Sequence, residues 1–238
     1  MAIYSDNGEI LGTVVDGEYC HQCKPDQPIE ISAKKPDRRL NGTGTGFVIG
    51  RNHIVTAEHV INDCGSVAVW QGHTELETAV LAKDAPTDLA ILKTSKSIRA
   101  AARLRMSPSL QMGEMAVNFG FPLYGTLSAG AIVTSGIVNA LTGFEDDPSQ
   151  FQYDAATQFG NSGGPVLDRY GNVIGVVSAK LDDSKAQLVN FAVNPTMLEQ
   201  LLKSSNVRWS SASTDEILDI PEIAQKASEF TVLIGCYE

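Results

Sequence analysis

One glycine-rich turn in this sequence could carry nucleophilic chemistry. Ser162 lies in Gly160-Asn161-Ser162-Gly163-Gly164-Pro165, where glycines permit a tight bend and a close approach by a substrate backbone. A serine hydroxyl is a weak nucleophile, so it needs a base beside it and donors for the oxyanion that develops. The backbone N–H groups of Gly160 and Ser162, with Asn161 between them, are predicted to form that oxyanion hole. By itself, such a turn could equally be an ordinary loop.

A candidate base and its partner lie earlier in the chain. His59 follows the apolar run 54–57 at a predicted strand-to-helix transition, and an imidazole titrates near neutral pH, as a general base must. Asp88 precedes the apolar run 89–92, where its carboxylate can accept a hydrogen bond from the ring and fix the tautomer. Either residue alone would more often be structural, but the order His, Asp, Ser is one in which this triad occurs. We therefore predict Ser162 as nucleophile, His59 as general base and Asp88 as the carboxylate that orients it.

The elements that must position these residues are predicted to be short strands. Apolar runs of four to eight residues bounded by glycine or charged turns are typical of all-β sandwiches and barrels. Near the amino terminus the pattern predicts strands at Glu9–Val15 and Pro28–Ser32. After Thr43 it predicts strands at Gly46–Ile49, His53–Ala57, Ser66–Trp70, Thr78–Ala82, Asp88–Lys93, Met115–Phe119, Ala129–Val133, Gly136–Leu141 and Asn172–Ala179.

Helices are predicted only toward the carboxyl end. Asn194 is a good N-cap, Pro195 suits the first helical position, and the apolar residues that follow share one face. After a polar stretch, a second short helix is predicted at Pro221–Ser228 and a final strand at Phe230–Cys236.

Further motifs, together with those above, resemble the trypsin-like superfamily and most closely the bacterial HtrA (Deg) proteases. The matching segments are Gly44–Ile49, Thr56–Val60, Thr87–Ala90, Gly120–Pro122, Thr134–Leu141, Asp154–Ala156, the Ser162 turn, Gly175–Ser178 and Asn190–Val193. The resemblance covers about residues 42 to 203. It implies two six-stranded antiparallel β-barrels with the active site in the cleft between them, plus a C-terminal helix.

The resemblance also implies a function and a set of substrate contacts. The function is that of a serine endopeptidase acting through an acyl-enzyme on protein or peptide substrates, without a cofactor. Ser178, Ala179 and Lys180 would form the edge strand that pairs with the substrate backbone, with Ser178 also donating to Asp88. Ala156 and Thr157 would line the primary specificity pocket, and because neither is charged, a small or medium apolar residue is expected before the scissile bond. The alternative is a catalytically silent pseudo-protease that binds extended peptides.

Three segments are expected along the chain. Residues 1–41 form an N-terminal extension that contains a Cys-x-x-Cys motif, residues 42–205 form the protease core, and residues 206–238 comprise a linker, a short helix and a strand. The last segment is too short for the PDZ domain of HtrA proteases. It resembles the helix and first strand that precede the Gly-x-Gly-Phe strand in relatives. It therefore either supplies the first barrel strand in permuted order or begins another domain.

Composition excludes several partners. The net charge of −10 argues against nucleic acid and against anionic membrane surfaces, which both attract clustered Lys and Arg. No apolar run approaches the roughly 20 residues needed to span a bilayer, and the first residues lack a signal-peptide pattern. A cytoplasmic location is therefore expected. The oligomeric state and any regulatory partner or further domain are left open.

The four cysteines are too few for a disulfide scaffold. Cys20 and Cys23 have metal-ligand spacing, but zinc needs two more ligands, which Cys64 and Cys236 could supply only if the fold brought them close. Zinc, a disulfide and reduced thiols stay open for these residues. Reduced thiols are expected, and no metal is predicted at the active site.

Overall fold

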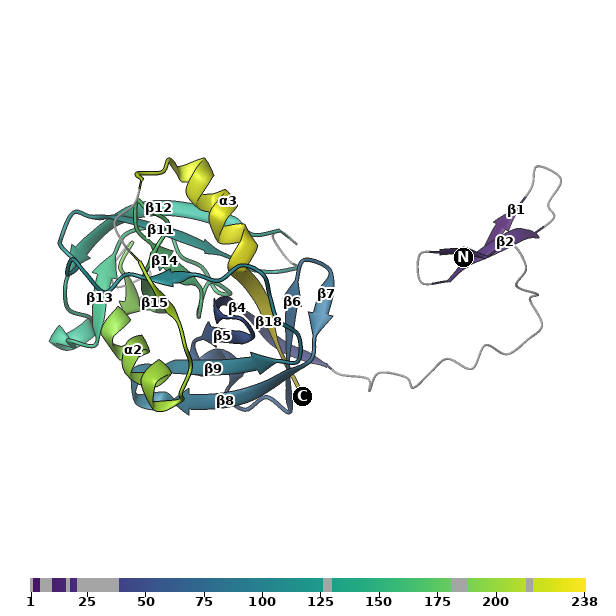
Figure 1. Ribbon diagram of the computed structural model, residues 1–238, viewed down its shortest axis with the longest axis horizontal. Helices are drawn as coiled ribbons and strands as arrows, with labels where there is room; N and C mark the ends of the chain where they lie inside the picture. The colour runs from purple at the N-terminus through teal and green to yellow at the C-terminus, as the bar shows by residue number, and fades with distance from the viewer. Residues whose placement is uncertain are drawn as a thin grey trace. The chain divides into compact units, whose positions relative to one another are not determined.

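The computed structural model in Figure 1 describes residues 2–4, 10–15, 18–20, 39–125, 130–180, 188–212 and 216–238. The chain divides into two units, Met1–Asp37 and Arg38–Glu238. In the first unit, antiparallel pairing joins β1 (Ala2–Tyr4), β2 (Ile10–Val15) and β3 (Glu18–Cys20) in one sheet. Strand β2 matches the predicted strand at Glu9–Val15, whereas the one predicted at Pro28–Ser32 lies outside the described residues.

The second unit contains a seven-stranded sheet, which we call the half-barrel. Its strands lie in the order β7-β6-β18-β4-β5-β9-β8. Their bounds are β4 (Leu40–Gly50), β5 (His53–Thr56), β6 (Ser66–Gln71), β7 (Thr74–Leu76), β8 (Thr78–Asp84), β9 (Leu89–Thr94) and β18 (Thr231–Tyr237).

An eight-stranded sheet follows, and six of its strands form what we call the closed barrel. Strand β14 pairs with both β11 and β15, which completes a ring in the order β14-β11-β12-β13-β16-β15. Short parallel strands, β10 and β17, extend the sheet from β15. The bounds are β10 (Arg103–Leu104), β11 (Met115–Gly120), β12 (Ile132–Ala140), β13 (Gln150–Tyr153), β14 (Pro165–Leu167), β15 (Val173–Lys180), β16 (Asn190–Val193) and β17 (Ser210–Ser211).

The two barrels differ in closure. The all-β class and the chymotrypsin-like pair of barrels are confirmed, but only the second ring is completed by backbone pairing. In the half-barrel, β6 has β18 on one edge and β7 on the other, so neither edge is available to β8. Strand β8 pairs with β9 alone and exposes Val80 and Leu81.

One predicted break in the closed barrel is absent. Residues 132–133 of the strand expected at Ala129–Val133 and residues 136–140 of the one expected at Gly136–Leu141 lie in one strand, β12, whereas Ala129 is outside the described residues. Gly136, taken as the start of a new strand, lies inside it opposite Ala116 of β11. A Cβ atom at Gly136 would collide with Asp154 Oδ1 and with the backbone of Ala155. The glycine therefore reflects a close approach of two segments rather than a turn.

Helices are few in the described ranges. They are α1 (Glu58–Ile61), α2 (Pro195–Ser204), α3 (Ile220–Phe230) and the 3-10 turns η1 (Ala85–Thr87) and η2 (Phe144–Asp146). Helix α2 begins at Pro195 as predicted, although the Asn194 side chain donates to Pro148 O (2.8 Å) instead of capping the helix. Helix α3 begins with a reciprocal capping box between Asp219 and Glu222, which fixes its start.

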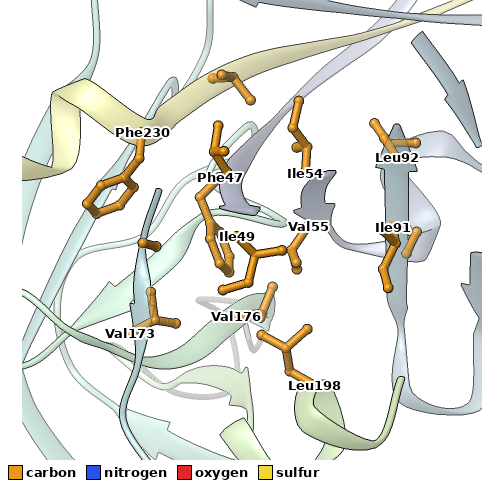
Figure 2. Close-up of a cluster of buried hydrophobic side chains, with 14 of the residues drawn as sticks. Phe47, Ile49, Ile54, Val55, Ile91, Leu92, Val173, Val176, Leu198 and Phe230 are labelled. Atoms are coloured by element: carbon orange, nitrogen blue, oxygen red, sulfur yellow. The ribbon is translucent and has the colours of Figure 1, made fainter. Parts of the chain in front are cut away.

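A shared apolar core packs the half-barrel against the closed barrel. Figure 2 shows side chains from both sheets and from helices α2 and α3 meeting in one buried cluster. The labelled members are Phe47, Ile49, Ile54, Val55, Ile91, Leu92, Val173, Val176, Leu198 and Phe230. Because burial of apolar surface is the main favourable term in folding, this cluster fixes the two sheets relative to one another.

The carboxyl-terminal strand lies inside the half-barrel. Helix α3 leads directly into β18, which runs between β4 and β6 and is antiparallel to both (Figure 1). Cys236 of β18 forms a disulfide with Cys64, 172 residues away in sequence, with their Cα atoms 5.3 Å apart. The expectation of reduced thiols was therefore wrong for this pair, because the fold brings together two cysteines whose sequence spacing gave no sign of it.

Candidate active site

His59 and Asp88 meet at one edge of the half-barrel. His59 lies in the short helix α1, directly after β5, and Asp88 directly precedes β9. Strands β5 and β9 are paired in register, Thr56 opposite Ala90, and this pairing brings their ends together. The ring nitrogen Nδ1 of His59 lies 2.9 Å from Asp88 Oδ1 and 2.8 Å from Asp88 Oδ2. Two residues 29 positions apart thus form the pair that the sequence predicted.

The backbone around Asp88 holds its carboxylate in place. Asp88 follows the η1 turn with a left-handed φ of 54°, and its own N–H donates to Ala85 O. The N–H of His59 donates to Asp88 Oδ1 over 3.0 Å, and the N–H of Glu58 donates to Asp88 O over 3.2 Å. The first turn of α1 is therefore anchored on the same residue that contacts the imidazole.

Burial and hydrogen bonding shift both titrations in this pair. The hydrogen bond with Asp88 raises the pKa of His59 above its ordinary value, outweighing burial, which lowers it. Burial raises the pKa of Asp88, but hydrogen bonds from His59 and Ser178 outweigh it and hold the pKa below its usual range. Near neutral pH, the carboxylate is therefore charged and ready to stabilise a protonated ring.

The Ser162 turn belongs to the closed barrel and is tightly bent. Gly160 and Gly163 have φ of 98° and 82°, values that favour glycine. The N–H of Gly163 donates to Val177 O over 2.7 Å, and that of Gly164 donates to Asn161 O over 2.9 Å. Across residues 39–125, 130–180, 188–212 and 216–238, no protein acceptor takes the N–H of Gly160 or Ser162. Both donors are therefore unpaired within the part of the chain that the structure describes.

The peptide between Phe159 and Gly160 has a fixed orientation. The carbonyl oxygen of Phe159 accepts a hydrogen bond from the N–H of Leu123 over 2.8 Å. Since C=O and N–H point in opposite directions across a trans peptide, this bond directs the N–H of Gly160 away from Leu123. A side chain at Gly160 would also collide with Phe121 O.

Ser162 and His59 face the same hollow but share no hydrogen bond. The hollow has a volume of about 260 Å³ and is lined by residues of β4, α1 and the Ser162 turn, among them Thr43, His59, Phe159 and Ser162. The Ser162 hydroxyl lies 3.4 Å from Ser178 O, to which it donates, and it makes no hydrogen bond to His59. Such bonds are often long or unmade without substrate. The structure thus assembles the imidazole–carboxylate half of the predicted triad and leaves the hydroxyl beside it.

Of the other predicted site residues, Ser178 has the clearest contact. Its hydroxyl donates to Asp88 Oδ2 over 2.6 Å, so that Asp88 is held from both barrels. Ala179 and Lys180 continue β15 and pair with Phe191 and Asn190 of β16.

Thr157 is buried in a small polar cluster, and Ala156 beside it is exposed. The Thr157 hydroxyl donates to Ala155 O (3.0 Å), accepts from Asn118 Nδ2 (2.7 Å) and lies 3.2 Å from the Tyr153 hydroxyl. Burial raises the pKa of Tyr153 to about 12, so its hydroxyl is neutral. The Thr157 hydroxyl therefore forms its hydrogen bonds with groups of the protein itself.

Sequence reasoning missed one side chain that contacts the serine turn. Thr45 of β4 is fully buried, and its N–H donates to Ser162 O over 2.9 Å while its hydroxyl donates to Gly160 O over 2.6 Å. In the sequence, Thr45 belongs to the segment Gly44–Ile49 that supports the family resemblance, but no role was predicted for its side chain. A local signal did exist, because a threonine between two glycines, Gly44 and Gly46, indicates a crowded backbone approach.

Fold and site geometry together define the structural class of the protein: the two-barrel fold of the chymotrypsin type. Comparison with known proteins narrows that class. A sequence profile described as "Trypsin-like peptidase domain" matches residues 44–176, more than half of the chain, and the chain belongs to this family.

Similar sequences and structures agree with this assignment and with the HtrA resemblance. Uncharacterized protein y4bJ of Sinorhizobium fredii is 39% identical over 206 residues, 82% of this chain and 32% of that protein. The putative serine protease HhoB of Synechocystis is 36% identical over 163 residues, 66% of this chain and 39% of that protein. The crystal structure of the serine endoprotease from Yersinia pestis matches with a TM-score of 0.61 and 25% identity, over 69% of this chain and 58% of that one. The chain spans about a third to a half of the length of the curated relatives it matches.

Proposed function

We propose that the protein is a serine endopeptidase, with Ser162 as nucleophile, His59 as general base and Asp88 as the carboxylate that orients the ring. The observation that carries this proposal is the 2.8 Å contact between His59 and Asp88 at the hollow that Ser162 also lines. Membership of the trypsin-like peptidase family supports it. A second function has no observation in its favour among the described residues, and this includes the pseudo-protease alternative.

Acylation follows from this geometry. Rotation of the Ser162 side chain away from Ser178 O brings its hydroxyl toward the free Nε2 of His59, which accepts the proton as the oxygen attacks the peptide carbonyl carbon. The carbonyl oxygen becomes an oxyanion and accepts hydrogen bonds from the N–H groups of Gly160 and Ser162. Asp88 stabilises the protonated ring through Nδ1–H. When the C–N bond breaks, the leaving amine takes the proton from Nε2 and an acyl-enzyme remains.

Deacylation reverses these roles with water. His59 Nε2 takes a proton from a water molecule that attacks the ester carbonyl, and the same two N–H groups stabilise the second oxyanion. As the C–O bond breaks, the serine oxygen recovers its proton from the ring. The carboxylic acid product leaves and the starting enzyme is restored.

The substrate in this proposal is an extended polypeptide. Ala179 and Lys180 of β15 pair with β16 on one edge, with a register shift at Ser178, and β14 pairs with β15 only at residues 173–176. A substrate strand can therefore pair along the other edge of residues 178–180, a mode that tolerates many sequences. The HtrA-type relative AlgW, whose structure contains a decapeptide, supports a peptide ligand.

Selectivity in this proposal is for a small or medium apolar residue before the scissile bond. Ala156 and Thr157 carry no charge, and the occupied Thr157 hydroxyl leaves only its methyl group to a substrate. A library of peptides cleaved by the protein tests this preference. Dominant cleavage after Lys or Arg would contradict it.

We further propose that the chain comprises an N-terminal extension of residues 1–41, a peptidase core of residues 42–205 and a last segment of residues 206–238. In this proposal, residues 206–238 belong to the peptidase domain and supply its first barrel strand in permuted order. The pairing of β18 with β4 and β6 supports this assignment. Deletion of residues 206–238 is expected to abolish folding of the domain, as measured by circular dichroism. A deletion variant with unchanged activity would indicate the start of a separate domain.

The cytoplasmic location expected from the sequence stays a prediction. None of the described helices is long and apolar enough to cross a membrane. Disulfides such as Cys64–Cys236 persist mainly in oxidising compartments, and a relative from Chlamydia trachomatis is named a probable periplasmic endoprotease. Fractionation of the source organism tests the prediction, and recovery with envelope markers would contradict it.

Covalent labelling tests the catalytic proposal directly. A fluorophosphonate probe reacts only with a serine hydroxyl that is activated by a base and faced by oxyanion donors. The wild-type protein is expected to be labelled at Ser162, and Ser162→Ala is expected to abolish labelling while leaving the fold intact. Ser135→Ala, on an exposed position of β12, is the matched control. A folded wild-type protein that binds peptides without being labelled would overturn the proposal.

A further inference from the structure

Thr45 connects the half-barrel to three points on the closed barrel. Its N–H donates to Ser162 O (2.9 Å), its hydroxyl donates to Gly160 O (2.6 Å), and the same hydroxyl oxygen accepts from the N–H of Phe121 (3.0 Å). Its own carbonyl oxygen accepts from the Thr56 hydroxyl over 2.8 Å. Every polar group of this buried residue is thus engaged, and three of these bonds end at the serine turn or at the segment behind it.

These bonds act on the two peptide planes that flank Gly160. The N–H of Leu123 holds the carbonyl before Gly160, and the Thr45 hydroxyl holds the carbonyl of Gly160 itself. The φ of 98° at Gly160 is consequently fixed from both sides. A rotation of either peptide would break one of these hydrogen bonds, of which the one from Thr45 is buried, and would redirect the N–H of Gly160.

The surroundings leave room for this hydroxyl and for little else. A Cβ atom at Gly120 would lie 2.8 Å from Thr45 Oγ1 and 2.7 Å from Asn161 Oδ1. A Cβ atom at Gly44 would meet Val60 and the carbonyl of Ser162. The close approach of β4 to the serine turn therefore depends on glycines at both positions.

We propose that Thr45 is a positioning residue for the oxyanion hole: its hydroxyl bridges Gly160 O and Phe121 N–H and so holds the N–H of Gly160 toward the substrate carbonyl. The inference rests on the proposed peptidase function of the same site. Thr45 touches neither substrate nor reacting atoms and acts through the backbone of Gly160 and Ser162. Because the oxyanion donors are used mainly in the transition state, its loss should lower kcat rather than raise KM.

The chain offers a matched control for the key substitution. Thr231 of β18 is also a buried threonine of the half-barrel, but its hydroxyl has no hydrogen-bond partner among the described residues. Thr45→Val and Thr231→Val remove the same atom from equally buried sites in one sheet. Only the first change removes hydrogen bonds to the serine turn.

The experiment compares these variants in the full chain, with a fluorogenic peptide carrying Val before the scissile bond and with fluorophosphonate labelling rates. Thr45→Val is expected to lower kcat by about 10- to 100-fold with KM within about twofold, because a small misplacement of catalytic groups costs up to about 100-fold. Thr231→Val should match the wild type, and Thr45→Ser, which keeps the hydroxyl, should recover most of the lost kcat.

Several outcomes would overturn the inference. Thr45→Val with wild-type kcat, an equal loss in Thr231→Val, or a folded Thr45→Ser as impaired as Thr45→Val would each do so. If Thr45→Val does not accumulate as folded protein, Gly120→Ala is compared with the double variant Gly120→Ala with Asn161→Ala, because the added methyl group presses on both the Thr45 hydroxyl and Asn161 Oδ1 and only the first contact remains in the double variant. Both variants should show the same loss of kcat, and full activity in the double variant would reject the inference. Failure of the wild-type protein itself to be labelled would instead reject the peptidase proposal.

Discussion

The two halves of the candidate site differ in how completely they are formed. On the half-barrel, His59 and Asp88 contact each other directly because the strands that carry them are hydrogen-bonded neighbours. Across the barrels, Ser162 faces His59 without a hydrogen bond. The register of strand pairing fixes a contact within one sheet, whereas a contact between sheets depends on the relative position of the two barrels. In the proposed mechanism, substrate binding therefore has to complete only the contact between Ser162 and His59.

The link between barrels is nevertheless not left to apolar packing alone. Ser178 donates across the interface to Asp88, and Thr45 donates across it to the serine turn. These hydrogen bonds are directional, so they define the distance from imidazole to hydroxyl more narrowly than a hydrophobic core can.

Substituting Asp88 by Asn disrupts the His59–Asp88 pair and has the largest expected effect. An amide can leave the ring in the wrong tautomer and cannot stabilise its protonated form, so kcat should fall about 10⁴-fold. Steady-state kinetics on a fluorogenic peptide measures this loss. Asp84→Asn, at the end of β8 and four residues before Asp88, is the control and should keep its activity. A loss below tenfold in Asp88→Asn would mean that the pair does not orient the base.

Removing the disulfide tests whether the stability of the half-barrel depends on the covalent attachment of its last strand, β18. The double variant Cys64→Ala with Cys236→Ala should lower the free energy of unfolding by about 2–5 kcal/mol, because the bond closes a very long loop. Urea titration of the oxidised wild type and the variant measures the difference. Treatment of the wild type with a dithiol should give the same decrease, and equal stability in all three samples would contradict the prediction.

Ser178→Ala tests the link between the barrels. The variant removes a short hydrogen bond to a charged carboxylate but leaves His59 in contact with it. We expect kcat/KM to fall about tenfold, since a hydrogen bond to a charged group contributes about 1.5–3 kcal/mol. A decrease as large as that of Asp88→Asn would show that the half-barrel does not hold Asp88 without help.

The titration of His59 gives the smallest expected effect. The hydrogen bond with Asp88 raises its pKa, and the general base must be neutral, so kcat/KM should rise with pH through a midpoint above 6.5. In Asp88→Asn the group that raises the pKa is gone, so the ring should titrate at a lower pH than in the wild type. NMR of the His59 ring, assigned by its loss in His59→Gln, measures both midpoints. An unchanged or higher midpoint in Asp88→Asn would contradict the assignment of cause.

Local patterns in the sequence predicted most strands of the half-barrel, the start of α2 and the three candidate catalytic residues, but they missed the closed-barrel strands β13, β14 and β16, which are only three or four residues long. Strand β12 was divided wrongly because Gly136 looks like a turn residue, although it serves a close contact with Asp154. The Cys64–Cys236 bond and the role of Thr45 depend on residues far apart in the chain. No spacing rule predicts such contacts, since the disulfide arises only when β18 pairs with β6 and the Thr45 contacts arise only when the two sheets pack. The catalytic roles themselves stay predictions until labelling tests them.

Strand β18 has a consequence for how this protein comes into being. Its neighbour β4 ends at Gly50 and therefore leaves the ribosome long before β18, which begins at Thr231. The disulfide that fastens β18 likewise joins cysteines 172 residues apart. Until β18 emerges, β4 lacks one of its two neighbouring strands, and the segment around Thr45 lacks the partner strand that carries Leu233. Under the proposed function, a nascent chain would therefore lack a complete half-barrel, and with it the strand opposite Thr45, until residues 231–237 have been translated.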